Sequence, residues 1–126
     1  MDSIKVLMVD DESRMRKLVK DFLTREGYMV LEAGDGEQAL DIFMNDKNIS
    51  LVILDVMMPK MDGMSATKKI RTMNRPDAAQ IPIIAMTANA FEEDARKCVE
   101  AGMNAHLSKP LQMDVVVGTI AEYYKR

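Results

Sequence analysis

The sequence predicts a three-layer α/β domain in which a doubly wound, five-stranded parallel sheet lies between two layers of helices. Short apolar runs alternate along the chain with longer segments of helical period. The runs are apolar over nearly their whole length, which is typical of parallel strands buried on both faces. A length of 126 residues suits one core. We therefore expect a single domain over residues 1–126, built as five strand–helix repeats with right-handed crossovers.

Five runs rich in Val, Ile and Leu are the predicted strands. Three of them are expected to be buried on both faces, and the clearest examples are the first and the third. The five runs cover residues 4–9, 28–33, 51–54, 81–86 and 105–107.

A helix is predicted after each strand. Apolar residues recur at i, i+3, i+4 and i+7 from Met15 to Phe22, and a similar spacing follows Ala39. Residues that favour helix ends mark the boundaries. We expect Ser13 to cap the first helix and Gly27 to end it, Asp35 to cap the second, Asp62 to cap the third, Gly102 to end a fourth over 91–101, and a fifth over 112–125.

Composition excludes several classes of protein. Apolar residues make up 48% and charged residues 29%, and the formal charge is 17 − 20 = −3. Without a run of Lys and Arg, direct binding to nucleic acid is not expected. No apolar stretch approaches the roughly 20 residues that span a bilayer, so membrane insertion is not expected either. The single cysteine, Cys98, and the absence of a leader sequence predict a cytoplasmic protein.

Polar residues follow four of the predicted strands. In open parallel sheets the ligand crevice lies beyond the carboxyl ends of the strands. Asp10 and Asp11 follow the first strand and Asp55 the third, so these carboxylates converge if the two strands are neighbours. Because they repel one another, a cation must lie among them, and oxygen ligands suit Mg²⁺. Thr87 after the fourth strand and Lys109 after the fifth are available for phosphate oxygens.

An aspartate beside a divalent cation is a nucleophile suited to phosphoryl transfer, where positioning and charge neutralisation dominate catalysis. Asp55 is the natural candidate. Together with its neighbours it resembles the receiver domain of two-component response regulators, over essentially the whole chain. The segments that carry the resemblance are Val9-Asp10-Asp11-Glu12, Leu54-Asp55-Val56-Met57-Met58-Pro59-Lys60-Met61-Asp62-Gly63, Ala85-Met86-Thr87-Ala88 and Lys109-Pro110.

The resemblance implies a flavodoxin-like fold with strand order 2-1-3-4-5, taken by analogy. It further implies that Asp55 accepts a phosphoryl group from a phosphohistidine on a sensor histidine kinase or phosphotransfer domain, and later loses it to water. Asp11, Asp55 and the backbone carbonyl of Met57 would ligate Mg²⁺, for which Mn²⁺ could substitute, and Asp10 would contribute directly or through water.

The resemblance also assigns residues to switching. Lys109 would pair with the phosphate, Thr87 would swing toward it, and the Lys109–Pro110 peptide would be cis. The usual aromatic switch position, three residues before the lysine, holds His106. One hypothesis is that this imidazole moves between exposed and inward positions, and the alternative is an exposed histidine without a signalling role.

The implied output is a protein interaction, and the chain is not expected to be an enzyme beyond promoting its own phosphorylation and dephosphorylation. The fourth helix, fifth strand and fifth helix, roughly residues 91–124, would form the face for a downstream partner or output domain, or for a homodimer. Because residue 126 follows the fifth helix closely, no output domain is expected within this sequence.

Three other functions compete with this interpretation. A phosphatase of the haloacid dehalogenase type needs a second Asp two residues after its nucleophile, where this chain has Met57. A mononucleotide binder of flavodoxin type needs a hydroxyl- and glycine-rich loop after the first strand, and Asp10, Asp11 and Glu12 would repel its phosphate. A receiver-fold interaction module that ignores phosphorylation remains as the main alternative.

Lys68, Lys69 and Arg71 are interpreted as a solvated helix face.

Overall fold

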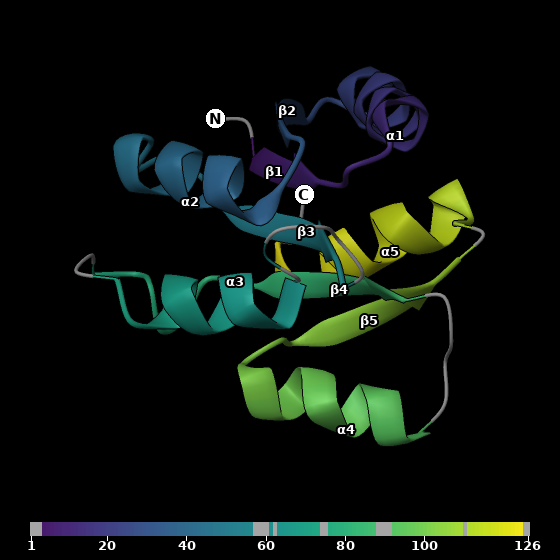
Figure 1. Cartoon of the computed structure of the whole chain (residues 1–126). Helices are drawn as coiled ribbons and strands as arrows, with labels where there is room; N and C mark the ends of the chain where they lie inside the picture. The colour runs from purple at the N-terminus through teal and green to yellow at the C-terminus, as the bar shows by residue number, and fades with distance from the viewer. Residues whose placement is uncertain are drawn as a thin grey trace.

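The computed structural model describes residues 4–56, 61, 63–73, 76–87, 92–109 and 111–124, and the side chains of 92–95 are outside this description. Strands and helices alternate along the whole of it (Figure 1). In chain order they are β1 (Lys5–Val9), α1 (Ser13–Arg25), β2 (Met29–Ala33), α2 (Gly36–Asn45), β3 (Leu51–Asp55), α3 (Gly63–Arg71), β4 (Ile83–Thr87), α4 (Glu92–Ala101), β5 (Ala105–Ser108) and α5 (Met113–Tyr123).

The strands form one parallel sheet in the order β2-β1-β3-β4-β5, which confirms the predicted topology. Of the three inner strands, β3 and β4 are buried at every residue and β1 is buried at all but its first. The edge strands β2 and β5 are only partly buried. The prediction of three strands covered on both faces is therefore confirmed, because helices flank the middle of the sheet on both sides.

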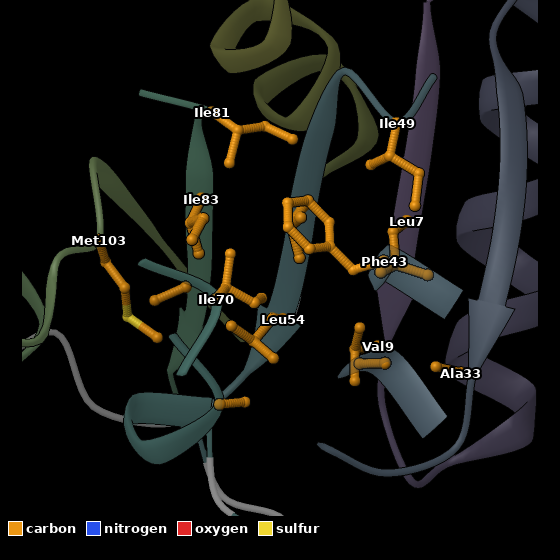
Figure 2. Close-up of a cluster of buried hydrophobic side chains, with 14 of the residues drawn as sticks. Leu7, Val9, Ala33, Phe43, Ile49, Leu54, Ile70, Ile81, Ile83 and Met103 are labelled. Atoms are coloured by element: carbon orange, nitrogen blue, oxygen red, sulfur yellow. The ribbon is translucent and has the colours of Figure 1, made fainter. Parts of the chain in front are cut away.

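Alternate residues of the central strands feed two separate hydrophobic cores. On one face, Leu7, Val52 and Ile83 pack against α2, α3 and α4, where Phe43 and Ile70 are fully buried (Figure 2). On the other face the intervening strand residues pack against α1 and α5, through Val19, Leu23, Val116 and Ile120. Two cores on one sheet hold the strand ends in fixed relative positions.

The helix boundaries confirm some of the predicted caps and correct one. The Asp35 carboxylate accepts a hydrogen bond from the Gln38 N–H at 2.8 Å, as an N-cap should. Gly27 and Gly102, after α1 and α4, have φ angles of 93° and 106°, which favour glycine. Ser13, predicted as the first cap, is instead the first residue of α1. Glu12 occupies the N-cap without a side-chain cap.

Arg71 corrects the predicted solvated face of α3. Lys68 and Lys69 are exposed. Arg71 instead turns toward the segment after α3 and the end of α4. Its guanidinium donates to the backbone carbonyls of Gly102 at 2.6 and 2.9 Å, Ile81 at 2.7 Å and Ala78 at 3.1 Å, and to Asn104 Oδ1 at 2.7 Å. Helical period does not reveal this, because the acceptors are backbone groups of other segments.

Several predicted features lie outside the described residues. These are the Asp62 cap, the start of the fourth helix at residue 91, the Met57 carbonyl, Pro110 with its peptide bond, and residue 125 at the end of the fifth helix. Among the helices that are described, none is both long enough and apolar enough to cross a bilayer.

Candidate functional site

Four strand ends meet at the carboxyl edge of the sheet. Asp10 follows β1 and Asp55 ends β3, and these strands are direct neighbours. Thr87 ends β4, and the Lys109 N–H donates to the Thr87 carbonyl at 2.8 Å, which extends the β4–β5 pairing by one residue. The strand order therefore brings Asp10, Asp55, Thr87 and Lys109, four of the residues that the sequence singled out, to one edge.

Three carboxylates gather there. Asp10, Asp11 and Asp55 each have a carboxylate oxygen within 4.8 Å of the others. Asp10 and Asp55 are buried, with 0% and 3% of their surface exposed, while Asp11 is exposed. A buried group of like charges is unfavourable without a counter-charge, so the arrangement favours a bound cation.

Lys109 supplies part of that counter-charge. Its Nζ lies 2.9 Å from Asp55 Oδ2 and 3.8 Å from Asp10 Oδ2. Burial disfavours the charged ammonium, but the hydrogen bond to Asp55 and the charges of Asp55 and Asp10 outweigh this and raise the pKa of Lys109. Lys109 therefore stays protonated and bridges two of the three carboxylates.

Asp10 is the least satisfied member of the cluster. Its Oδ1 accepts the Glu12 N–H at 2.9 Å, whereas Oδ2 is buried and has no hydrogen-bond partner among the described residues. Burial is the main reason that the pKa of Asp10 rises from 3.8 to about 6, against the lowering effect of the Glu12 hydrogen bond. The neighbouring charge of Asp55 raises it further. At neutral pH the carboxylate is thus ionised and unfavourably placed.

Thr87 presents the second unsatisfied oxygen of the site. Its side chain is buried, and Oγ1 has no hydrogen-bond partner within the described part of the chain. A buried hydroxyl without a partner costs free energy, so such groups in a native fold call for an explanation. Here the hydroxyl lies at the same sheet edge as Asp55 and Lys109, where an incoming oxyanion can accept its hydrogen bond.

The donor set fits a magnesium ion. Mg²⁺ prefers oxygen ligands, uses one or two carboxylates and keeps room for waters and phosphate oxygens. Asp10 Oδ2, which accepts no hydrogen bond from the described residues, and the exposed Asp11 carboxylate are such ligands. The fourth expected ligand, the Met57 carbonyl, lies outside the described residues.

Gly63 is a part of the site that sequence reasoning named only as the last residue of the segment 54–63 that carries the resemblance. The Gly63 N–H donates to the Val56 carbonyl at 3.0 Å. A Cβ at this position would overlap the Asp55 carbonyl oxygen and lie 2.9 Å from Val56 Cα. Only glycine lets α3 start this close to the end of β3, so Gly63 fixes the backbone that carries Asp55. A glycine directly after Asp62, at the end of the loop that follows Asp55, was the available signal.

Arg16 is a second residue that the sequence did not single out. It lies on α1, and its Nη1 donates to the Asp10 carbonyl at 2.6 Å. Its distance of six residues from Asp10 gave no reason to connect it with the acidic residues.

His106, the predicted switch residue, is exposed on the edge strand β5. It lines a surface cavity of about 430 Å³ between β5 and α5, together with Lys109, Leu111 and Val115. The cavity lies next to the acidic residues and shares Lys109 with them. The structure thus brings Asp10, Asp11, Asp55, Thr87 and Lys109 together and leaves His106 on the adjoining surface.

Known proteins are similar to this chain in sequence and in fold. Residues 6–121 match the family described as response regulator receiver domain. Sensor histidine kinase RcsC of Escherichia coli K12 is 38% identical over 125 residues, which is 99% of this chain and 13% of the kinase. The chain thus spans only a small part of that relative.

Solved structures agree with the sequence matches. Chemotaxis protein CheY4 of Vibrio cholerae has a TM-score of 0.91 at 29% identity, covering 97% of this chain and 99% of that one. The receiver domain of sensor histidine kinase PA1611 of Pseudomonas aeruginosa has a TM-score of 0.86 at 30% identity, covering 97% and 98%. That structure has a magnesium ion coordinated in its active site cleft.

Proposed function

This chain belongs to the response regulator receiver family, and from that premise we propose that it is a single phosphoacceptor domain over residues 1–126 of a cytoplasmic two-component pathway. Asp55 takes the phosphoryl group from a phosphohistidine of a sensor histidine kinase or phosphotransfer domain. The observation that carries the proposal is the buried Asp55 carboxylate, which lies against Lys109 and within a group of three aspartates at the strand ends.

The proposed transfer uses groups of this chain at each point where charge changes. A carboxylate oxygen of Asp55 attacks phosphorus as the P–N bond of the phosphohistidine breaks, and the electron pair leaves with the imidazole. The product is an acyl phosphate, which water later hydrolyses to restore the carboxylate. Asp10, Asp11, Asp55 and the Met57 carbonyl would hold Mg²⁺, or Mn²⁺ in its place, which when bound neutralises charge on the phosphoryl oxygens.

Lys109 and Thr87 are the proposed contacts for the new phosphoryl group. The Lys109 ammonium, 2.9 Å from Asp55 Oδ2, exchanges this carboxylate oxygen for a phosphoryl oxygen. The buried Thr87 hydroxyl, without a partner in the described residues, donates to another. The Thr87 hydrogen bond forms only in the phosphorylated state, so it supplies the differential interaction that a two-state switch requires. The Lys109–Pro110 peptide is predicted to be cis.

We place the output at the face of α4, β5 and α5. Thr87 is separated from the β5 surface by one strand pairing, in which Thr87 lies opposite Ser108. His106, two residues before Ser108, lines the 430 Å³ cavity that is also lined by Val115 of α5. A downstream partner, an output domain or a second copy would read the change there. In this proposal, the only reactions that the receiver domain promotes are its own phosphorylation and dephosphorylation.

The test is intact-mass spectrometry after incubation with acetyl phosphate and Mg²⁺, sampled over time. We expect one phosphoryl adduct in the natural sequence and in Asp114→Asn, a matched change at an exposed aspartate of α5. Asp55→Asn and a chelator should each abolish the adduct. An adduct that persists in Asp55→Asn would contradict the assignment of the phosphoacceptor. No adduct in any sample, together with no binding of beryllium fluoride, would favour the phosphorylation-independent interaction module.

A further inference from the structure

We propose that Arg16 is a positioning residue that sets the Mg²⁺ affinity of the acidic site by holding the peptide between Asp10 and Asp11. The inference rests on the proposed function, because it assumes that these carboxylates hold the metal. Arg16 is not itself a ligand and does not touch the phosphoryl group. It acts through the backbone that carries two of the three carboxylates.

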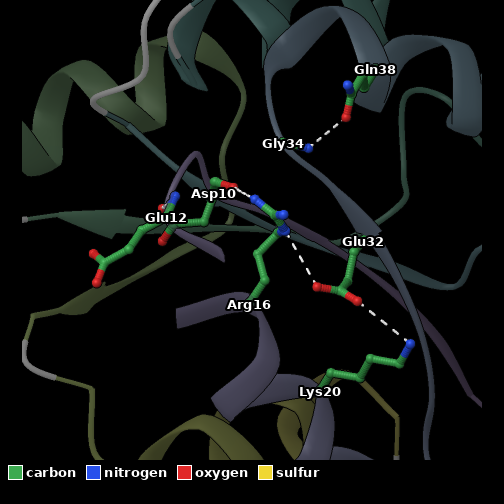
Figure 3. Close-up of polar contacts among 7 residues, drawn as sticks. All are labelled: Asp10, Glu12, Arg16, Lys20, Glu32, Gly34 and Gln38. Carbon is green, nitrogen blue, oxygen red and sulfur yellow. Dashed lines mark hydrogen bonds and ion pairs between the residues drawn. The ribbon is translucent and has the colours of Figure 1, made fainter. Parts of the chain in front are cut away.

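The contacts of Arg16 join α1 to two strands. Its Nη1 donates to the Asp10 carbonyl at 2.6 Å, and its Nε donates to Glu32 Oε1 of β2 at 3.3 Å (Figure 3). Its own backbone N–H donates to the Glu12 carbonyl at 3.2 Å, within the first turn of α1. Arg16 is therefore held through its backbone in α1 and through its guanidinium by Glu32, in addition to its contact with Asp10.

Apart from its carbonyl, all but one of the polar groups of Asp10 already have a hydrogen-bond partner. The Asp10 N–H donates to the Ala33 carbonyl at 3.2 Å, and Oδ1 accepts the Glu12 N–H at 2.9 Å. Because the Asp10 carbonyl accepts from Arg16, Oδ2 is the polar atom of Asp10 that has no hydrogen-bond partner in the described residues, and Lys109 Nζ lies 3.8 Å from it. The carbonyl of Asp10 and the nitrogen of Asp11 belong to one rigid peptide plane. Holding that carbonyl therefore also fixes where the exposed Asp11 side chain begins.

Glu32 aligns Arg16 and cancels much of its charge. Its two carboxylate oxygens lie 3.3 Å from Arg16 Nε and 3.5 Å from Lys20 Nζ. A guanidinium forms such paired, directional contacts better than an ammonium, because its donors lie in a fixed plane. A positive charge beside a cation site weakens cation binding, so charge alone would make Arg16 a disadvantage. The geometry points to orientation of the Asp10–Asp11 peptide as the reason for the contact.

Charge and orientation predict opposite signs, so one pair of variants separates them. Arg16→Met and Lys20→Met each remove one positive charge from α1 and one ion pair with Glu32. Of these two residues, it is Arg16 that contacts Asp10. Mg²⁺ affinity is measured by calorimetry on the full chain. We expect about tenfold weaker binding in Arg16→Met, as for other residues that orient metal ligands, and unchanged or slightly tighter binding in Lys20→Met.

A third variant tests the planar donor set. Arg16→Lys keeps the charge but cannot present two donors in the arginine geometry, so we expect Mg²⁺ binding to stay several-fold weaker than in the natural sequence. The backbone amide shifts of Asp10, Asp11 and Glu12 in the metal-free protein should move in Arg16→Met and Arg16→Lys and stay in place in Lys20→Met. These shifts report the loop itself and do not depend on phosphorylation.

Loss of overall stability is controlled with Ile120→Val, a change in the core that α5 forms with the sheet. This variant is expected to melt at a lower temperature and to bind Mg²⁺ normally. Equal or tighter Mg²⁺ binding in Arg16→Met than in Lys20→Met would overturn the inference and leave the proposed function standing. Failure of the natural sequence to bind Mg²⁺ would overturn both.

Discussion

Two clusters of polar side chains lie at opposite ends of the same sheet, and they differ in how completely their polar atoms are hydrogen-bonded. At the carboxyl end, the acidic site of Asp10, Asp11, Asp55, Thr87 and Lys109 leaves two buried oxygens without hydrogen-bond partners among the described residues. At the amino ends of β4 and β5, the guanidinium of Arg71 donates five hydrogen bonds of 2.6 to 3.1 Å.

The difference separates a structural cluster from a functional one. Buried polar groups in native proteins are almost always paired. The partly buried Arg71 cluster, formed by Arg71, Ala78, Ile81, Gly102 and Asn104, is paired in the same way. Asn104 Oδ1 also accepts the Ile83 N–H at 2.9 Å, and the Asn104 carbonyl accepts from Tyr123 Oη at 3.2 Å. In the acidic site the two oxygens without hydrogen bonds, Asp10 Oδ2 and Thr87 Oγ1, keep their capacity for a cation and a phosphoryl group. That capacity costs stability until a ligand binds.

The largest expected effect on stability comes from removing the guanidinium from the Arg71 cluster. Arg71→Met removes charged donors from three backbone carbonyls and one side-chain amide, each worth about 1 to 3 kcal/mol. We expect the free energy of unfolding in urea to fall by about 4 kcal/mol. Mg²⁺ affinity should stay within about twofold in the folded protein, because the cluster lies at the other end of the sheet. A large loss of Mg²⁺ affinity would show that the two ends are coupled.

Removing the buried charge of Asp10 should have the opposite effect and raise the free energy of unfolding. The pKa of Asp10 rises from 3.8 unfolded to about 6 folded, so the folded state holds the proton more tightly. Stability from this group is present below pH 4 and lost between pH 4 and about 6, by up to about 3 kcal/mol. Asp10→Asn should therefore be more stable than the natural sequence at pH 7 in the presence of a chelator.

The measurement for Asp10→Asn is urea unfolding from pH 4 to pH 7.5 without metal. The gap between variant and natural sequence should open as the pH rises, and Asp114→Asn on the exposed side of α5 should show no such gap. A constant gap across the range would contradict the assigned titration of Asp10.

Gly63 tests how tightly the acidic site depends on close backbone approach. Gly63→Ala places a Cβ against the Asp55 carbonyl and Val56. We expect a loss of about 2 kcal/mol from overpacking and slower formation of the Asp55 phosphoryl adduct. Gly118→Ala in α5 is the matched control, since its Cβ would meet nothing within 4 Å. That change should stabilise the helix by roughly 0.5 to 1 kcal/mol, and equal effects of both changes in thermal melts would refute the steric explanation.

The smallest expected effect concerns the counter-charge within the acidic site. Lys109→Met removes an ammonium 2.9 Å from Asp55 and 3.8 Å from Asp10. We expect Mg²⁺ to bind about fivefold more tightly, since a competing cation is gone, while the yield of the phosphoryl adduct falls. Lys97→Met, at an exposed position of α4, should change neither quantity. Weaker Mg²⁺ binding in Lys109→Met would mean that the ammonium supports the metal site.

Much of the acidic site could be predicted from sequence because strand ends are local features. Asp10, Asp55, Thr87 and Lys109 each follow an apolar run, and parallel strands bring all such positions to one edge whatever the loops do. The strand order came from the resemblance and not from the pattern. Hydrophobic period located the helices but not their first residues, so Ser13 was wrongly predicted as a cap.

What sequence alone determined, then, is the alternation of strands and helices and the chemistry at the strand ends. Only the tertiary structure decided which polar side chains reach backbone groups far away in the chain. Arg71 and Gly102 are 31 residues apart, and Arg16 meets Asp10 and Glu32 from different elements. Such contacts depend on the distance and angle between packed helices and strands. A linear pattern of residue types does not contain these quantities.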